Sequence, residues 1–481
     1  MTPTTIFLSF LVYTILLFSI SFITSRKADN ESYYLGNRQS PWYVVAYGMI
    51  GASLSGVTFI SIPGDVGSTQ FSYMMIVMGY LLGYFVIANV LLPVYYRMNL
   101  TSIYTYLESR FGFWAYKSGA FYFLLSRFVG ASFRMFLVVN VLQVFVFDAW
   151  NIPFYGSVIF FMVLMILYTF RGGIKTIVWT DTLQTTFMLA TVVLSILLIK
   201  ENLDVSMSGF INSIAQSDYS RVLNLDITEK TYFLKQFVSG AFIAIVMTGL
   251  DQDMMQKNLS CRTLGDAKKN VYWMSISLVP VNILILTLGA SLFLFANSQG
   301  IEIPERTDDL FPLIALKHLR PLAGIVFMIG LISAAYSSAD SALTSLTTSV
   351  MVDFLNIRKR NDLSEKQKTH RRYLVHFLVA SLIVVIIIVF RAINDESVIS
   401  RLFTIAGYTY GPLLGMFFFG LITSYKVKDH LLPIVVVLSP VISYLISATS
   451  EYWLFGYKFG FELLVVNGLL TFTGMYFLRK T

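Results

Sequence analysis

The chain has 481 residues, of which 56% are hydrophobic and only 13% are charged, and its mean hydropathy is +0.69. A soluble protein of this length would carry nearly twice that fraction of charged residues, so the composition excludes a soluble globular fold. The formal net charge of +8 requires no nucleic-acid partner, because Lys and Arg gather in alternate loops, and the single cysteine, Cys261, excludes an internal disulfide.

Apolar stretches long enough to cross a bilayer recur along the whole sequence, and about 13 can be distinguished. No gap between them could hold a soluble domain, so residues 1–481 are predicted to form one all-α integral membrane domain in the lipid bilayer. The stretches lie at about 5–24, 42–64, 72–95, 118–147, 153–170, 176–199, 234–256, 271–297, 322–352, 372–391, 397–422, 431–448 and 460–478.

The loops that alternate from 25–41 onward carry most of the Lys and Arg, including Lys257 and Arg262. Basic loops remain on the cytoplasmic side of a membrane. The pattern therefore predicts a multi-pass protein of the cell membrane, with its N-terminus outside and its C-terminus in the cytoplasm. An odd number of spans satisfies this arrangement.

The first polar interruption of an apolar span is GMIGASLSGVTFISIPGDVG, from Gly48 to Gly67. Glycines, hydroxyl residues and the pair Pro63–Gly64 all weaken a helix at this point. A broken membrane helix frees backbone carbonyls for cations and helix ends for anions. The alternative is a continuous helix with a glycine-lined packing face.

The next interruption is SRFVGASFRMFLVV, where Arg127 and Arg134 lie seven residues apart on one helix face. Both lie too far from the ends of their span for the two side chains to reach the interface. A buried arginine recognises carboxylates through two parallel hydrogen bonds. Structural pairing with an aspartate or a carbonyl is equally compatible with this pattern.

Two further polar stretches lie toward the cytoplasmic ends of their spans. In RGGIKTIVWTDTLQ, Asp181 follows Lys175 by six residues, which places it about 9 Å deep if the helix is regular. It fits either a cation site or a helix cap. In TGLDQDMMQKNL, we interpret the polar residues 251–253 as structural hydrogen-bonding groups.

The most polar span contains ISAAYSSADSALTSLTTSV, from Ile332 to Val350. An ionisable group such as Asp340 costs several kcal/mol at this depth unless it is paired or hydrated. Hydroxyls and carbonyls beside a carboxylate favour a hard cation such as Na⁺. For the hydroxyls alone, a seam of small residues that packs against another helix is an equal alternative. Small and hydroxyl residues share one face of this helix at Ala334, Ser337, Ser338, Ser341, Ser345 and Thr348.

These motifs, in this order, resemble the sodium:solute symporter family. AAYSSADSALTS resembles the serine-rich eighth core helix of the family, and SGVTFISIPG resembles its broken first core helix. GGIKTIVWTD, DQDMMQK and GYTYGPLLG resemble parts of the fifth, sixth and tenth core helices. The resemblance implies a LeuT-type fold with two inverted five-helix repeats, at about 42–199 and 234–422, one helix before them and two after.

The resemblance also implies the ligands of two cation sites. The first sodium site would use backbone carbonyls and hydroxyls from Gly51, Leu54, Ala334, Ser337 and Ser338. A second sodium site exists in only some members, and its matching positions are Asp181, Ser337, Asp340 and Ser341. Asp340 stands where some members have a serine, so two carboxylates would flank one ion.

The substrate is less well specified by the motifs. Members that transport sugars carry Glu-Gln at the positions of Val57 and Thr58, whereas the run 53–58 looks more like the sialic-acid branch. The arginine that this branch uses for the substrate carboxylate aligns between the two arginines of this chain. The candidate substrate contacts are Ser53, Ser55, Thr58, Tyr80, Arg127 and Arg134.

The resulting expectation is a Na⁺-coupled symporter that imports a small organic anion, such as sialic acid, by alternating access. It would use one or two Na⁺ ions, no organic cofactor, no nucleic acid and no obligate protein partner, and it would not be an enzyme. An intramembrane aspartyl protease is disfavoured because its Gly-x-Gly-Asp motif is absent. Two alternatives remain, a symporter of a neutral sugar, polyol or amino acid, and a transporter-like sensor subunit.

Overall fold

The computed structural model describes residues 2–24, 38–169, 173–393, 398–454 and 456–480. Within these ranges the chain is helical, and its only β-type pairings are isolated bridges such as Ser40 with Cys261. The α-helices are α1 (Pro3–Thr24), α3 (Trp42–Thr69), α4 (Tyr73–Val86), α5 (Leu92–Arg97), α6 (Thr105–Arg110), α7 (Phe113–Leu142), α8 (Phe154–Thr169), α9 (Gly173–Asn202), α10 (Met207–Ala215), α11 (Phe233–Ala244), α12 (Gln252–Asn258), α13 (Leu264–Gln299), α14 (Leu310–Leu313), α15 (Pro321–Ser349), α16 (Glu365–Ile393), α17 (Val398–Ile422), α18 (Leu432–Trp453) and α19 (Leu463–Phe477).

Ten helical segments of the described residues are long and apolar enough to cross a membrane. The pair Phe233–Gly249 and Gln252–Asn258 forms one further span that is bent by 71°, and α8 and α19 are shorter apolar helices. Together these segments agree with the number of spans, about 13, that was expected from hydropathy. The predicted fold class, an all-α membrane protein, is confirmed.

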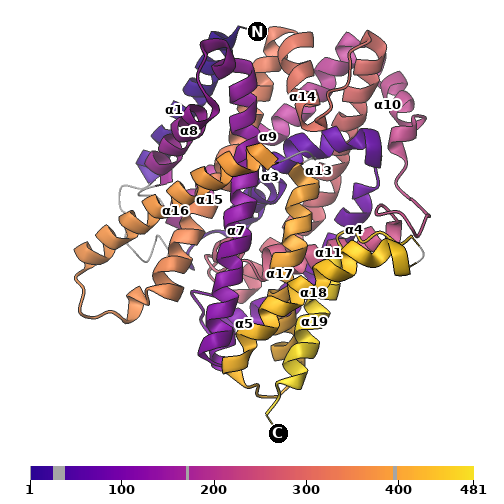
Figure 1. Cartoon of the computed structure of the whole chain (residues 1–481). Helices are drawn as coiled ribbons and strands as arrows, with labels where there is room; N and C mark the ends of the chain where they lie inside the picture. The colour runs from indigo at the N-terminus through magenta and orange to yellow at the C-terminus, as the bar shows by residue number, and fades with distance from the viewer. Residues whose placement is uncertain (1, 25–37, 170–172, 394–397, 455, 481) are drawn as a thin grey trace.

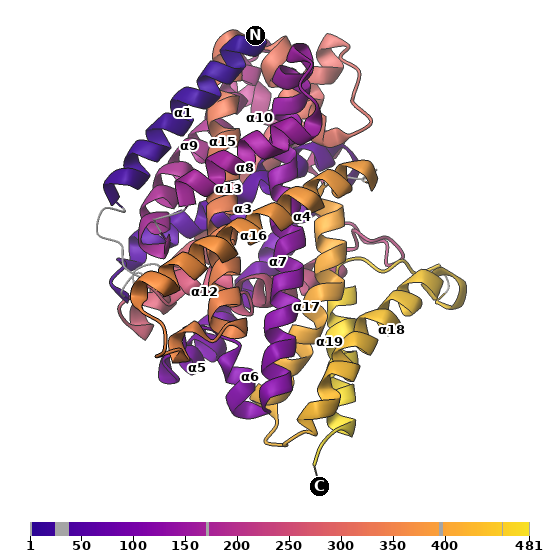
Figure 2. The ribbon, with the colours of Figure 1, turned by 60° about the vertical axis from the view of Figure 1, so that its left-hand side comes forward.

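The helices differ strongly in how much of their surface faces the protein. In the apolar, membrane-length part of α3, 89% of the residues are buried, against 22% in the span of α18. Helices α1 and α18 with α19 lie at opposite edges of the molecule in both views (Figures 1 and 2). The core around α3 is therefore enclosed by more peripheral helices whose apolar side chains face outward.

The first broken span is α3, which departs from helical geometry at Ser55 (φ 50°, ψ 175°). The predicted interruption is confirmed, but it does not lie at Pro63 and Gly64, which remain inside the helix. A Cβ added at Gly64 would lie 2.5 Å from the carbonyl oxygen of Thr307, so this glycine permits close packing of the 307 segment. The backbone of Ser55 lies in a region that costs about 1–3 kcal/mol, which is typical of functional sites.

The second broken span joins α11, a π-helical turn at Ile245–Gly249, and α12. Asp251 caps α12 by accepting hydrogen bonds from the backbone amides of Asp253 and Met254 at 2.9 and 3.3 Å. Gln252 donates to the carbonyl of Thr101 at 2.7 Å. The structural interpretation of this polar stretch is confirmed for Asp251 and Gln252. The broken spans α3 and α11–α12 begin where the two predicted repeats begin.

Helix α15 lies at the centre of the bundle and is buried from Gly330 to Ser349. It packs against α1, α3, α7, α8, α9, α12 and α16, which separate its polar residues from lipid. Several hydroxyls of this helix bond to carbonyls of the preceding turn, as Thr348 does to Thr344 at 2.8 Å. Those hydroxyls need no ligand, so part of the polar stretch is a packing seam.

Candidate functional site

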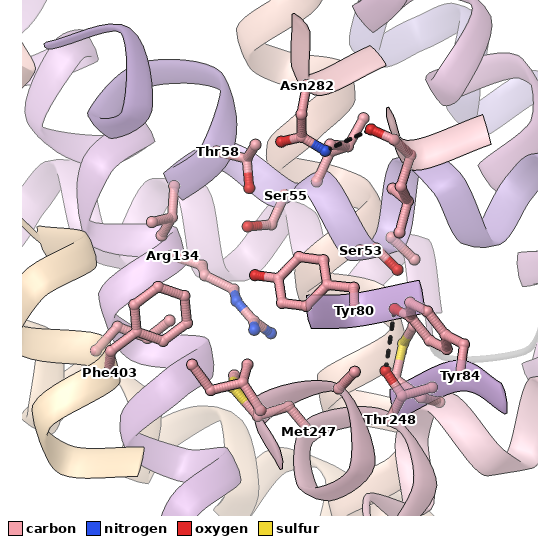
Figure 3. Close-up of a pocket in the computed structure, with 18 of the residues that line it drawn as sticks. Ser53, Ser55, Thr58, Tyr80, Tyr84, Arg134, Met247, Thr248, Asn282 and Phe403 are labelled. Atoms are coloured by element: carbon pink, nitrogen blue, oxygen red, sulfur yellow. Dashed lines mark hydrogen bonds between the residues drawn. The ribbon is translucent and has the colours of Figure 1, made fainter. Parts of the chain in front are cut away.

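A buried cavity lies beside the break in α3 (Figure 3). Its walls come from α3, α4, α7, α11, the π-helical turn at Ile245–Gly249, α12, α13 and α17. Every residue that the sequence predicted as a substrate contact lines this one cavity: Ser53, Ser55, Thr58, Tyr80, Arg127 and Arg134. The break at Ser55 brings the three α3 hydroxyl residues to the cavity wall.

Arg134 points its guanidinium group into the cavity, between Tyr80 and Met247 (Figure 3). The residue is 9% exposed, and its Nε has no hydrogen-bond partner among the described residues. No ion pair of Arg134 is found in the described part of the chain. A buried guanidinium without a counter-ion is unfavourable, so this arrangement suits an anionic ligand.

Arg127, two turns earlier on α7, has a different environment. Its guanidinium forms an ion pair with Asp253, and its Nη1 lies 3.8 Å from Oδ2 of Asp251. Tyr410 of α17 donates a hydrogen bond of 2.6 Å to the same oxygen of Asp251. The charge of Arg127 is therefore balanced by protein groups. The sequence did not distinguish the two arginines. Among the described residues, Arg127 has ion-pair partners and Arg134 has none.

The rest of the wall combines aromatic rings with a few polar groups. Tyr80 shares a hydrogen bond of 2.9 Å with Tyr73, and Tyr84 lies 3.4 Å from Oγ1 of Thr248. Asn282 donates from Nδ2 to the carbonyl of Leu278 at 2.7 Å, which leaves its Oδ1 as an acceptor. The sequence interpretation missed Tyr84, Met247, Thr248, Asn282 and Phe403. Asn282 was detectable, because it is a polar side chain inside an apolar span.

A second cavity of about 540 Å³ adjoins the first. Asp65, Lys230 and Tyr408 line it, and it shares Tyr73 and Phe403 with the buried cavity. These two aromatic side chains therefore stand between the cavities. Part of the wall of this second, outer cavity comes from loop residues such as Lys230 and Thr231, on the side that was predicted to face outward.

The residues of the predicted first sodium site lie on two helices that pack against each other, α3 and α15. The carbonyls of the last turn before a helix break lack regular helical partners, and this turn contains Gly51 and Leu54. Ala334, Ser337 and Ser338 are buried on α15, and Oγ of Ser338 has no hydrogen-bond partner among the described residues. The buried, unpartnered oxygen fits a hard cation.

Helix α9 approaches the same part of α3 very closely. A Cβ added at Gly51 would lie 2.1 Å from Oγ1 of Thr185, and one at Gly48 would lie 3.0 Å from Cβ of Asp181. The two glycines therefore let α9 bring its carboxylate next to the break. Asp181 lies two turns inside α9, so the helix-cap interpretation of this residue is wrong.

The predicted second sodium site contains a charged residue that the sequence interpretation misplaced. Ser337 donates a hydrogen bond of 2.9 Å to Oδ1 of Asp181, and Nζ of Lys257 lies 2.6 Å from Oδ2. Lys257 was predicted to lie in a cytoplasmic loop, but it lies in α12 and is 1% exposed. The two remaining predicted ligands, Asp340 and Ser341, keep side-chain oxygens without hydrogen-bond partners in the described structure.

Comparisons with known proteins agree with this architecture. Over 474 residues the chain is 23% identical to the sodium/sialic acid symporter NanT of Aliivibrio fischeri, covering 94% of this chain and 89% of the relative. It is 25% identical over 413 residues to the sodium-coupled monocarboxylate transporter 2 of Danio rerio, covering 82% of this chain and 63% of that protein.

Among solved structures, a substrate-bound, outward-open Na⁺-coupled sialic acid symporter superimposes with a TM-score of 0.83. That match has 18% sequence identity and covers 99% of this chain and 98% of the other, which shows a shared fold. The profile of the sodium:solute symporter family matches residues 33–427. The chain therefore belongs to the sodium:solute symporter family.

Proposed function

We propose that this symporter imports a small organic anion, with sialic acid as the leading candidate, together with Na⁺. The observation that carries the proposal is the guanidinium of Arg134, which points into a buried cavity without a counter-ion. A carboxylate can accept two parallel hydrogen bonds from such a group. The related proteins are named as transporters of sialic acid and of monocarboxylates, and both kinds of solute carry a carboxylate.

The remaining wall suits the rest of a hydroxylated solute. Ser53, Ser55, Thr58 and Tyr80 supply hydroxyls, and aromatic rings supply apolar surface. Arg127 lines the same cavity, but its ion pair with Asp253 favours a role in supporting the wall over one in binding the substrate carboxylate.

One turn of α3 links sodium to the substrate. Gly51 and Leu54 offer carbonyls to the first sodium site, while Ser53 and Ser55 line the substrate cavity. Na⁺ bound to the carbonyls would hold the strained turn in the conformation that presents the hydroxyls. Stabilising one conformation in this way couples the two ligands, and the coupling is reciprocal.

The proposal includes the direction of transport. Basic loops favour a cytoplasmic C-terminus and an external N-terminus in the cell membrane. The two ends of the chain lie at opposite ends of the molecule, as an odd number of crossings requires (Figure 1). The solute would enter through the outer cavity, pass Tyr73 and Phe403, and leave unchanged on the other side. The chain would work without an organic cofactor or an obligate protein partner.

Uptake into proteoliposomes tests the substrate. Labelled sialic acid should accumulate in an inward Na⁺ gradient and not when choline replaces Na⁺. Arg134→Ala should reduce substrate affinity by about thirtyfold to several thousandfold, because loss of one partner from a buried charge pair costs about 2–5 kcal/mol. Arg134→Lys should restore affinity only partly, because an ammonium lacks the two-pronged geometry.

The matched control is Arg320→Ala, which removes an arginine from an exposed pair with Glu201. This variant should transport like the unmodified protein, because exposed ion pairs contribute little. Unchanged uptake by Arg134→Ala would reject the anion assignment and favour a neutral sugar, polyol or amino acid. Binding of a solute without any uptake would favour a sensor.

A further inference from the structure

Lys257 and Asp181 form an ion pair that is deeply buried in the described structure. The proposed transport cycle gives this pair no role. Both side chains are 1% exposed, and Nζ lies 2.6 Å from Oδ2. The two residues are 76 positions apart, and the 71° bend before α12 directs Lys257 toward α9. The ammonium of Lys257 thus bonds to Asp181, the carboxylate that the family resemblance assigns as a ligand of the second sodium ion.

The local charges leave room for one mobile cation. Ser337, which donates to Asp181, lies three residues before Asp340 on α15, so the two carboxylates and the ammonium of Lys257 lie in one region of the protein. The cluster has a net charge of −1 when all three groups are ionised. One Na⁺ at the site between α3 and α15 would neutralise it. A second Na⁺ about 4 Å from the ammonium would bind about a thousandfold more weakly, because like charges repel strongly at a partly buried site.

The contacts of Asp181 support the same arrangement. One carboxylate oxygen accepts from Ser337, a predicted ligand of the first sodium site, and the other accepts from Lys257. Ser338 and Ser341 keep hydroxyl oxygens without partners in the described part of the chain, so oxygen ligands remain for a single ion nearby.

We propose that the ammonium of Lys257 is a built-in cation that replaces the second sodium ion, so that the transporter binds one Na⁺ per cycle. This inference rests on the sodium coupling of the proposed function and specifies its stoichiometry. Import of a monovalent anion with one Na⁺ moves no net charge. A tenfold Na⁺ gradient would therefore support about tenfold accumulation, and the membrane potential would not change it.

The test counts sodium ions on the purified, full-length protein without substrate, using ²²Na⁺ in a scintillation proximity assay. The unmodified protein should bind one Na⁺ with a Hill coefficient near one. Lys257→Met should bind two, because Asp181 and Asp340 would then share a site without a resident cation. Lys257→Arg should bind one, because it keeps the fixed positive charge.

Lys235→Met is the matched control for the removal of a buried lysine from the same broken span. The ammonium of Lys235 donates to the backbone carbonyls of Glu229 and Lys458 rather than to a carboxylate. This variant should still bind one Na⁺. Size-exclusion chromatography and thermal unfolding would establish that each variant is folded.

Two results would overturn the inference. One is the binding of two Na⁺ to the unmodified protein, which requires no variant and decides the question even if Lys257→Met does not fold. The other is a folded Lys257→Met protein that still binds one Na⁺, because the pair would then be purely structural. Since no substrate is present, failure of the sialic-acid assignment leaves these measurements unaffected.

Discussion

Replacing Ser338 with alanine removes one predicted sodium ligand with little effect on the remaining structure. The side chain is 3% exposed, and its hydroxyl has no hydrogen-bond partner among the described residues. The substitution therefore breaks no protein contact of this hydroxyl, and the unfolding free energy should change by less than about 0.5 kcal/mol. An oxygen that bonds a charged group is worth about 1.5–3 kcal/mol. The sodium concentration for half-maximal uptake should rise by about ten- to 150-fold.

The measurement is initial uptake against Na⁺ concentration, with the substrate held at saturation. Ser345→Ala is the control, because the Ser345 hydroxyl is buried on the same helix but donates to the carbonyl of Ala342 at 3.1 Å. That variant should need no more than about twice the sodium of the unmodified protein. Equal sodium dependence for Ser338→Ala and the unmodified protein would reject the first sodium site.

Three further changes test other parts of the structure. Arg127→Ala should lower the unfolding free energy by about 3–5 kcal/mol, because it leaves the buried carboxylate of Asp253 unpaired. A melting temperature equal to that of Arg134→Ala would contradict this. Gly51→Ala should reduce stability by about 1–3 kcal/mol through the clash with Thr185, and Thr185→Ala in the same chain should recover part of the loss, because it removes the hydroxyl that lies nearest. A Na⁺ concentration of 100 times its dissociation constant should raise the unfolding free energy by about 2.7 kcal/mol relative to choline. An unchanged melting temperature would argue against sodium binding in the absence of substrate.

The spans and their broken character were predictable because lipid imposes simple rules on a sequence. A crossing helix must be apolar over its length, so hydropathy alone identifies the membrane segments. Asp340 is conspicuous for the same reason, since a carboxylate in such a segment is costly. The exact break is less predictable. Pro63 is a strong helix breaker in water but is accommodated inside α3, while Ser55 adopts the irregular backbone.

The partners of the buried charges could not be predicted, because they depend on contacts between distant parts of the chain. Arg127 and Arg134 share one helix face, but the position of Asp253 on α12 pairs Arg127 and leaves Arg134 without an ion pair in the described part of the chain. Lys257 looked like an ordinary basic residue of a cytoplasmic loop. Its burial follows from the sharp bend before α12, which hydropathy does not reveal.

Helix α12 links the two halves of the mechanism. Near its N-terminus Asp253 pairs with Arg127 of α7, and near its C-terminus Lys257 pairs with Asp181 of α9. Tyr410 of α17 joins the same cluster through the cap residue Asp251, so three further helices are held to one short element. In the proposed orientation this cluster lies between the substrate cavity and the cytoplasm. The contacts of this one element therefore join the helix that carries Arg134 to the helix that carries Asp181.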